Sequence, residues 1–354
     1  MVCENKNFAF SLLPLFSIMP NIKLNSNNDN LFNTNKSKYE FSQFIQNFNK
    51  INIKEIEPTI RKNIYENIFG EHISIIVNEL TYLHFKELNE GRERKLIRKH
   101  ILDYINNTKT NLQEIYNWLL NNQNDSNSLF WLGYFNYHGI IINSNMKKAF
   151  KLFQKAANLE NSAAQFDLAN MYIDGEGVDK NYVKAFELSK KLAKKGYSCG
   201  INLLGYCYID GIGTDINMQK GIELYQKTAD LGNCIAQYNL AYMYKDGDGV
   251  EIDYNKAFEL FKKSAEKEYS NGITMLGYCY NNGIGTDINK LKAFESYQKA
   301  ANLENHYAQY SLALMYENGD GVEKNIKKAI YWYNEAVEQG NINAQVKLEG
   351  LFEG

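Results

Sequence analysis

Apolar residues recur along most of this chain at the three- and four-residue spacing of an amphipathic helix, and the pattern itself repeats every 36 residues. A leucine marks each period, at Leu132, Leu168, Leu204, Leu240, Leu276, Leu312 and Leu348. A fixed period between about 20 and 50 residues is typical of stacked repeat arrays. We therefore predict an all-α fold, an α/α superhelical solenoid of 36-residue helix-turn-helix repeats preceded by a small helical region.

Each unit carries its own signals for the ends of its helices. A glycine lies seven residues after each of the first six leucines and is expected to end the first helix with a positive φ, at Gly139, Gly175, Gly211, Gly247, Gly283 and Gly319. An Asn or Asp six residues further on is expected to cap the second helix, at Asn145, Asn181, Asn217, Asp253, Asn289 and Asn325. One such hairpin cannot bury its apolar face alone, so we expect its core to form against the next hairpin.

A second period of 72 residues lies over the first. The phrase LGYCYIDGIGTDIN at 204–217 returns as LGYCYNNGIGTDIN at 276–289, while the units at Leu168, Leu240 and Leu312 share Ala-Gln and Gly-x-Gly-Val. A dinucleotide loop needs a preceding strand, and a Walker loop needs a Gly-Lys-Ser/Thr ending, and neither accompanies these glycines. The pattern therefore indicates a duplicated packing unit with structural turns.

The amino-terminal third of the chain has a different character. Residues 21–38 are polar and aperiodic, which predicts a disordered tail. Helical patterning then predicts one helix from Pro58 to Gly70 and another from about His72 to Asn89. Two more are expected at 92–107 and from Thr110, where Gln113 suggests a capping box. The predicted domains are a tail at 1–38, a helical region at 39–125, and a solenoid of six repeats and a half at 126–354.

Charge, cysteine content and apolar runs bear on where the protein acts. The formal net charge of −2 predicts no general attraction to nucleic acid or to an anionic membrane. The five cysteines form no Cys-x-x-Cys pair, which favours a reducing compartment. The apolar run Phe8–Met19 is too short to span a bilayer and has no clear cleavage site. We therefore expect a cytoplasmic protein, with the secretory pathway as a minor alternative.

No residue pattern points to catalysis or to a bound cofactor. The five histidines lack metal-ligand spacing, no Gly-x-Ser-x-Gly elbow is present, and nothing nominates a catalytic triad. The sequence therefore predicts a protein that is not an enzyme and has no metal site and no cofactor. The basic stretch RERKLIRKH at 92–100 is interpreted as the solvated face of an amphipathic helix, the alternative being contact with a phosphorylated or acidic partner.

The segment AQYNLAYMYKDGDGVEIDYNKAFELFKKSAEK, residues 236–267, gives the repeat in its clearest form. It resembles the Sel-one-like repeat, a relative of the tetratricopeptide repeat, and the resemblance covers about 126–350. The resemblance implies a non-catalytic scaffold or adaptor that binds partner proteins or peptides, for example in signalling. The alternatives are a regulatory module that acts with a kinase-like partner, and a secretory-pathway adaptor of the kind used in degradation at the endoplasmic reticulum.

Four positions depart from the family's pattern. Ile141 replaces the second loop glycine of the first unit and Glu349 replaces a small residue in the last helix, which suggests modified ends. Ser189 replaces an aromatic residue and Gly221 replaces an alanine, and both suggest locally looser packing.

Aromatic residues recur on the first helix of the units, two residues before or after the leucine. Aromatic side chains are enriched in protein interfaces, so we hypothesise that these rings bind a partner protein or peptide: Tyr134, Phe166, Tyr206, Tyr238, Tyr242, Tyr278 and Tyr310. The alternative is that they pack between adjacent hairpins. The sequence leaves the partner's identity and the oligomeric state open.

Overall fold

The computed structural model describes residues 58–108 and 110–353, so the tail predicted at 1–38 and the apolar run Phe8–Met19 lie outside the described residues. The chain divides into two compact units, 1–65 and 66–354, and the second contains all the described helices except the start of the first one. Within the described residues there are sixteen helices and no strand, as predicted. Three helices precede the repeats: α3 (Pro58–Glu90), α4 (Arg94–Asn107) and α5 (Leu112–Asn121).

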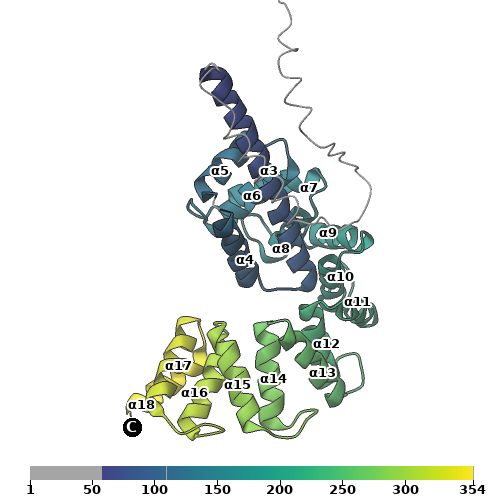
Figure 1. Ribbon diagram of the computed structural model, residues 1–354. Coiled ribbons are helices and arrows are strands. Elements are labelled where there is room, and N and C mark those ends of the chain that lie inside the picture. The colour runs from purple at the N-terminus through teal and green to yellow at the C-terminus, as the bar shows by residue number, and fades with distance from the viewer. Residues whose placement is uncertain (1–57, 109, 354) are drawn as a thin grey trace, which may run out of the picture. The chain divides into compact units, whose positions relative to one another are not determined.

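The remaining helices alternate between a first and a second helix of each repeat. The first helices are α6 (Ser126–His138), α8 (Ser162–Asp174), α10 (Ser198–Asp210), α12 (Cys234–Asp246), α14 (Ser270–Asn282), α16 (His306–Asn318) and the unpaired α18 (Ile342–Glu353). The second helices are α7 (Met146–Asn158), α9 (Tyr182–Lys194), α11 (Met218–Asp230), α13 (Tyr254–Glu266), α15 (Lys290–Asn302) and α17 (Ile326–Glu338). Each helix packs against its neighbours in chain order, so the predicted solenoid is confirmed (Figure 1).

The predicted helix ends are present in all six complete repeats. The six glycines that close the first helices are left-handed, with φ between 65° and 82°. The six Asn or Asp side chains at the start of the second helices each accept a hydrogen bond from the backbone N–H three residues on. Because these residues satisfy orphan backbone groups at helix ends, local sequence determines where each of these first helices ends and where each second helix begins.

Two aromatic contacts recur where one repeat meets the next. Phe258 of α13 lies edge-on to Tyr280 of α14, with ring centroids 5.5 Å apart and an interplanar angle of 78°. The corresponding pairs are Phe150–Tyr172, Phe186–Tyr208 and Phe294–Tyr316, at 5.4 to 5.5 Å. Lys292 of α15 places its ammonium 5.2 Å from the centre of the Tyr280 ring. One tyrosine therefore connects three consecutive helices.

The second loop glycine of each repeat lets that loop approach the preceding repeat closely. A Cβ atom on Gly213 would lie 2.2 Å from the carbonyl oxygen of Tyr182. Ile141 occupies this position in the first repeat with the same positive φ, 68°, and its side chain is exposed. Within the described residues no repeat precedes this loop, so Ile141 has no second helix of an earlier repeat to approach.

The structure corrects three local predictions. Gly70 does not end a helix, because α3 is continuous from Pro58 to Glu90. The cap of α5 is Asn111, in a capping box with Glu114, rather than Thr110.

The third correction concerns the packing expected to be loose. Ser189 is fully buried and donates to the carbonyl of Phe186 at 2.7 Å. Gly221 has the Ile209 side chain in the space that a Cβ would need, 2.5 Å away. Neither residue therefore marks loose packing.

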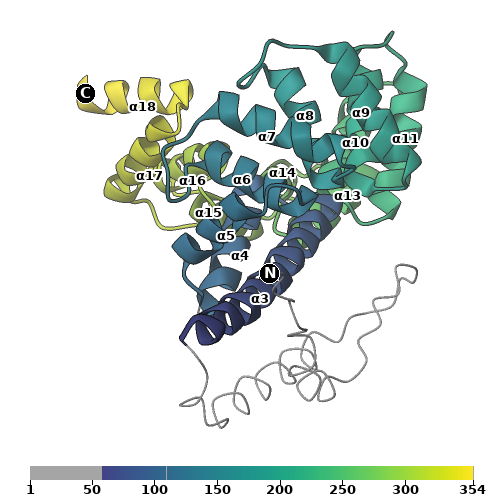
Figure 2. The same cartoon turned by 90° about the horizontal axis from the view of Figure 1, so that it is seen from above.

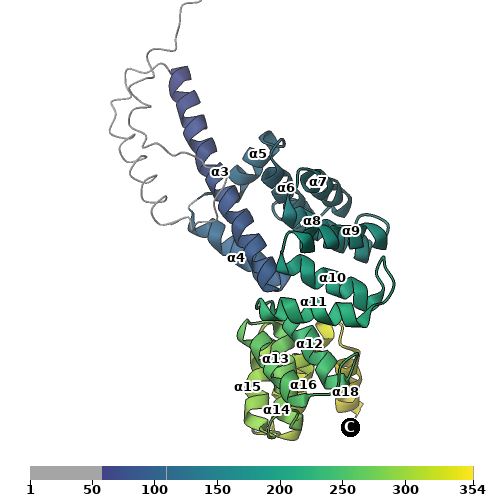
Figure 3. The same ribbon diagram turned by 90° about the vertical axis from the view of Figure 1, so that its right-hand side faces the viewer.

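The helices before the repeats share the core of the first repeats. Ile73 and Leu80 of α3, Ile97 of α4, and Phe130 and Trp131 of α6 belong to one buried apolar cluster. The Trp131 indole also donates to the Thr81 hydroxyl at 2.8 Å. Figures 2 and 3 show α4 folding back beside α3. These helices therefore cover apolar surface that the first repeat would otherwise expose. None of the described helices has the length and apolar character needed to cross a bilayer.

We expect Asn217→Ala to lower the free energy of unfolding by about 1 kcal/mol, because the Asn217 side chain accepts from the backbone N–H of Lys220 at 3.0 Å. Urea titration followed by circular dichroism measures the change. Asn318→Ala, at an exposed position near the end of α16, is the matched control and is expected to cause no loss. Equal losses in the two variants would contradict the capping role.

Candidate functional site

The first helices of the repeats form one continuous side of the solenoid, which we call the first-helix face. The seven aromatic residues singled out in the sequence lie on these helices but differ in exposure. Tyr206 and Tyr278 are exposed, at 36% and 40%. Phe166, Tyr238, Tyr242 and Tyr310 are half-buried. Tyr134 is buried, with 3% exposed.

Tyr134 is covered by this chain's own α3. The His84 ring lies 5.2 Å from it in an edge contact, and Trp131 lies 5.0 Å away. Burial also raises the pKa of the Tyr134 hydroxyl. The N-terminal helices occupy the first-helix face at this point, so Tyr134 is not available to a partner.

On α12 and α14 the aromatic residues form a connected surface cluster. Tyr238 and Tyr242 meet edge to face at 4.9 Å, and the Tyr242 hydroxyl donates to the sulfur of Met275 at 2.9 Å. The Lys245 ammonium lies 5.0 Å from the centre of the Tyr242 ring. The cluster thus crosses the boundary between two repeats.

Tyr206, Tyr242 and Tyr278 occupy the same position on three successive first helices, and we call them the tyrosine patch. Burial raises the pKa values of Tyr206 and Tyr242, so both keep a neutral hydroxyl at neutral pH. The patch therefore offers ring surface together with hydroxyl donors, the combination favoured at protein interfaces.

Beneath α4 lies a buried polar cluster that joins it to α6 and α8. The Arg94 guanidinium lies 3.4 Å from an Asp167 carboxylate oxygen and donates to the Tyr137 hydroxyl at 2.9 Å. Tyr137 in turn donates to Glu176 at 2.5 Å. Burial raises the pKa of Asp167 to about 6, although Arg94 acts in the opposite direction.

The same cluster includes two histidines held neutral by burial. Burial lowers the pKa of His84 to about 3 and that of His138 to about 4, and nearby arginines add to both shifts. Neither ring nitrogen of His84 has a hydrogen-bond partner among the described residues. The cavity beside them measures about 10 Å³, which holds nothing larger than a water molecule. This cluster therefore has no room for a substrate.

The basic stretch 92–100 is only partly a solvated face. Arg92 donates to the Lys267 carbonyl at 3.4 Å, Arg94 pairs with Asp167, and Lys95 pairs with Glu304. Arg98 and Lys99 are exposed. The beginning of α4 thus meets carbonyl and carboxylate groups of the repeats themselves.

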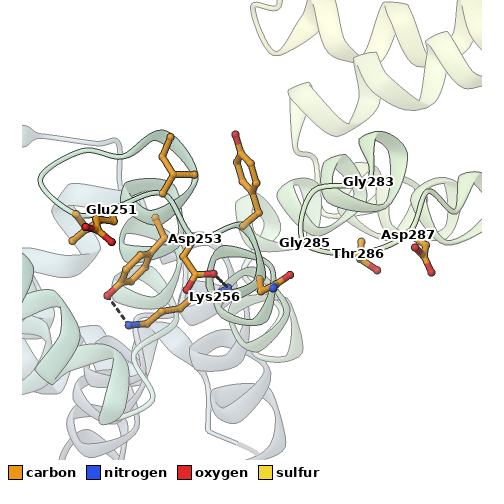
Figure 4. Close-up of a pocket in the computed structure, with 12 residues that line it drawn as sticks. Glu251, Asp253, Lys256, Gly283, Gly285, Thr286 and Asp287 are labelled. Atoms are coloured by element: carbon orange, nitrogen blue, oxygen red, sulfur yellow. Dashed lines mark hydrogen bonds between the residues drawn. The ribbon is translucent and has the colours of Figure 1, made fainter.

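A hollow lies between the loops of the fourth and fifth repeats, near the start of α13 (Figure 4). Its volume is about 1090 Å³. Two of its charged side chains already have structural partners: Asp253 caps α13 and Lys256 donates to the Tyr244 hydroxyl at 2.6 Å. The hollow is thus lined by the loop that ends the first helix of each of the two repeats and by the start of α13.

The cysteines of the described residues are a further set of titratable groups. The four cysteines of the described residues are free and buried, and burial raises the pKa values of Cys199, Cys234 and Cys279 to about 12. Such thiols are poor nucleophiles, because the thiolate is the reactive form. Among the residues that the structure describes, no group of three or more His, Cys, Asp or Glu side chains could hold a metal ion.

Residues 89–93, the last two residues of α3 and the three that lead to α4, are called the α3–α4 turn. Sequence reasoning did not find that this turn docks onto the first-helix face. Asn89 accepts from the backbone N–H of Cys199 at 3.3 Å, and Glu93 accepts from that of Ser270 at 2.7 Å. The available signal was the tyrosine at 197 and 269, where neighbouring repeats have an asparagine cap. A tyrosine at this position indicates that the first N–H groups of α10 and α14 need an acceptor from another part of the chain.

The Sel1 repeat family model matches six consecutive segments: 126–161, 162–197, 200–233, 234–269, 270–305 and 306–341. Among solved structures, a Sel1 repeat protein from Oxalobacter formigenes is 28% identical with a TM-score of 0.59, and the match covers 67% of this chain and 98% of that one.

A protective antigen present in uropathogenic Escherichia coli strains, which displays an SLR fold, is 32% identical with a TM-score of 0.50. That match covers 71% of this chain and 55% of the antigen, so this chain spans about half of the antigen's length. A search of curated proteins gave no match.

Acidification tests the burial of His84. Between its ordinary pKa of 6.5 and the lowered value of about 3, the unfolded chain binds one more proton than the folded chain, so stability falls as the pH falls. From pH 7 to pH 5 this histidine contributes a loss of about 2 kcal/mol. We expect His84→Leu to reduce the pH-dependent loss by that amount, measured by urea titration at both pH values. Asp167 and His138 are present in both proteins, so their contributions to the pH dependence are shared. Identical losses of stability in the native protein and in His84→Leu would contradict the burial of a neutral His84.

Proposed function

Because this chain belongs to the Sel1 repeat family, we propose that it is a non-catalytic scaffold that binds a partner protein or peptide on the first-helix face. Sel1 repeat solenoids typically mediate protein–protein interaction. The tyrosine patch is the observation that carries the proposal. Its rings occupy equivalent positions on α10, α12 and α14, and two of them are exposed without a covering element.

The arrangement of the patch suits binding of an extended segment or a helix. Successive repeats present a ring at each step, so contacts repeat along a partner that runs across the helices. Tyrosine offers a large contact area at a low entropic cost, because only two side-chain torsions must be fixed. Phe166 and Tyr310 are half-buried at the flanks of the patch and belong to the same proposed surface.

The chemistry of the described residues supports a role without catalysis. The buried polar cluster encloses too little space for a substrate. Two charged residues that line the hollow near α13 have structural partners, since Asp253 caps α13 and Lys256 donates to Tyr244. The free thiols support a cytoplasmic location. Within this proposal, the identity of the partner decides between an adaptor in signalling and a regulatory module of a kinase-like enzyme.

We expect Tyr206→Ala combined with Tyr278→Ala to weaken partner binding at least tenfold, because exposed aromatic anchors contribute on the order of 2 kcal/mol each at interfaces. Quantitative affinity capture of partners, followed by titration of the purified partner, measures the loss. Circular dichroism of both proteins verifies that the fold is intact.

The matched control is the triple variant Tyr182→Ala, Tyr254→Ala and Tyr331→Ala. These tyrosines are also exposed, but they lie on second helices, away from the first-helix face. The control is expected to bind normally. Unchanged affinity of the patch variant, or an equal loss in the control, would refute the assignment of the patch.

A further inference from the structure

A short turn at residues 89–93 joins α3 to α4, and α3 itself fixes the turn's backbone. Gly91 has a φ of 75° and donates its N–H to the carbonyl of Leu88 at 3.0 Å, which is the left-handed ending typical of a helix. Glu93 occupies the cap position of α4, but its side chain makes no hydrogen bond to that helix. The carboxylate reaches a different element instead.

The repeats alternate in how their first helices are capped. Asparagine side chains cap α8, α12 and α16, at Asn161, Asn233 and Asn305. Tyr197 and Tyr269 stand at the same place before α10 and α14, and neither makes a side-chain cap hydrogen bond. These two helices therefore lack an acceptor of their own for their first N–H groups.

The turn supplies both missing acceptors. The Asn89 side-chain oxygen accepts from the N–H of Cys199 at the start of α10, and a Glu93 carboxylate oxygen accepts from the N–H of Ser270 at the start of α14. The positive end of a helix dipole also favours the negative charge of Glu93. Two side chains four positions apart in the sequence thus cap helices from alternate repeats.

Between these two helices, α12 binds the backbone of the turn. The Asn233 side chain donates to the carbonyl of Asn89 at 3.0 Å, and the Cys234 thiol donates to the carbonyl of Gly91 at 3.0 Å. Elsewhere the matching asparagine holds the preceding first helix, as Asn161 does through Asn127 at 2.9 Å. The turn therefore takes the place of α10 as the partner of α12.

The fit leaves no room for a side chain at the centre of the turn. A Cβ atom on Gly91 would lie 2.5 Å from the Asn233 side-chain oxygen and 2.8 Å from its carbon. Asn233 is held in place because its oxygen also caps α12, by accepting from Ala236 at 2.9 Å. Glycine is consequently required at this point both for its φ and for the space.

We propose that the N-terminal ends of α10, α12 and α14 form a docking site for a protein turn with two side-chain oxygen acceptors four residues apart around a central glycine, and that residues 89–93 are its built-in occupant. A partner with the same chemistry can enter only when this turn leaves. The tethered turn has an effective local concentration on the order of millimolar, so it outcompetes a dilute free peptide. The site is separate from the tyrosine patch, which lies further along the same helices.

The test compares Gly91→Ala with Gly340→Ala in the full chain. Both glycines have a positive φ, 75° and 84°, but nothing lies within 4 Å of a Cβ on Gly340. We expect Gly91→Ala alone to speed hydrogen exchange at least tenfold at the starts of α10 and α14, while the start of α16 is unchanged. A labelled peptide of residues 86–96 should then bind Gly91→Ala saturably, restore slow exchange, and not bind Gly340→Ala.

A second variant guards against misfolding of Gly91→Ala. Asn89→Ala with Glu93→Ala removes only the two acceptors and should give the same faster exchange, whereas Glu93→Gln keeps an oxygen acceptor and should preserve protection at α14. A peptide with both alanines should not bind. Equal hydrogen-exchange rates at the starts of α10 and α14 in Gly91→Ala, in the double alanine variant and in the Gly340→Ala control would overturn the proposal. So would failure of the native peptide to bind once the site is exposed.

Discussion

The packing of each first helix against the second helix of the preceding repeat is the interaction on which the rest of the array depends. Tyr280 shows why, since its ring meets Phe258 of α13 on one side and Lys292 of α15 on another. Edge-to-face rings contribute about 0.5–1.5 kcal/mol beyond the area they bury. Because each contact involves only adjacent helices, stability is approximately a sum over neighbours. The first repeat therefore needs other apolar surface to pack against, and α3 to α5 provide it.

The 72-residue period reflects two alternating ways of starting a repeat. In α8, α12 and α16 an asparagine caps the helix and joins it to a neighbour, and a glutamine such as Gln237 reaches back to the carbonyl of Ala229 at 3.1 Å. In α10 and α14 a glycine lets the helix approach the preceding one, since a Cβ on Gly200 would lie 2.3 Å from Leu192. The helices α10 and α14 have no side-chain cap from their own repeat, and each receives one from the α3–α4 turn.

Local chemistry made the repeats predictable from sequence, while long-range packing did not. Glycine at the end of a helix and asparagine at its start act within a few residues, so Gly211 and Asn217 could be assigned without a structure. Gly70 carries the same signal, yet α3 continues through it. Tyr134 shares its repeat position with Tyr206, but the placement of α3 against it helps to bury Tyr134, whereas Tyr206 is exposed. That placement depends on contacts between residues far apart in the chain.

The docking site of the α3–α4 turn and the tyrosine patch lie on the same three helices, at their starts and further along them respectively. The α3–α4 turn bonds to the starts of α10, α12 and α14 at once, so it restricts how these three helices move relative to one another. Tyr206, Tyr242 and Tyr278 lie further along those helices, so a change in how the helices are held at their starts would also reach the tyrosine patch. Binding is stronger when the surface is already ordered, since less entropy is lost on association. On these two proposals, docking of the turn at one end would preorganise the partner surface at the other, and its release would soften that surface.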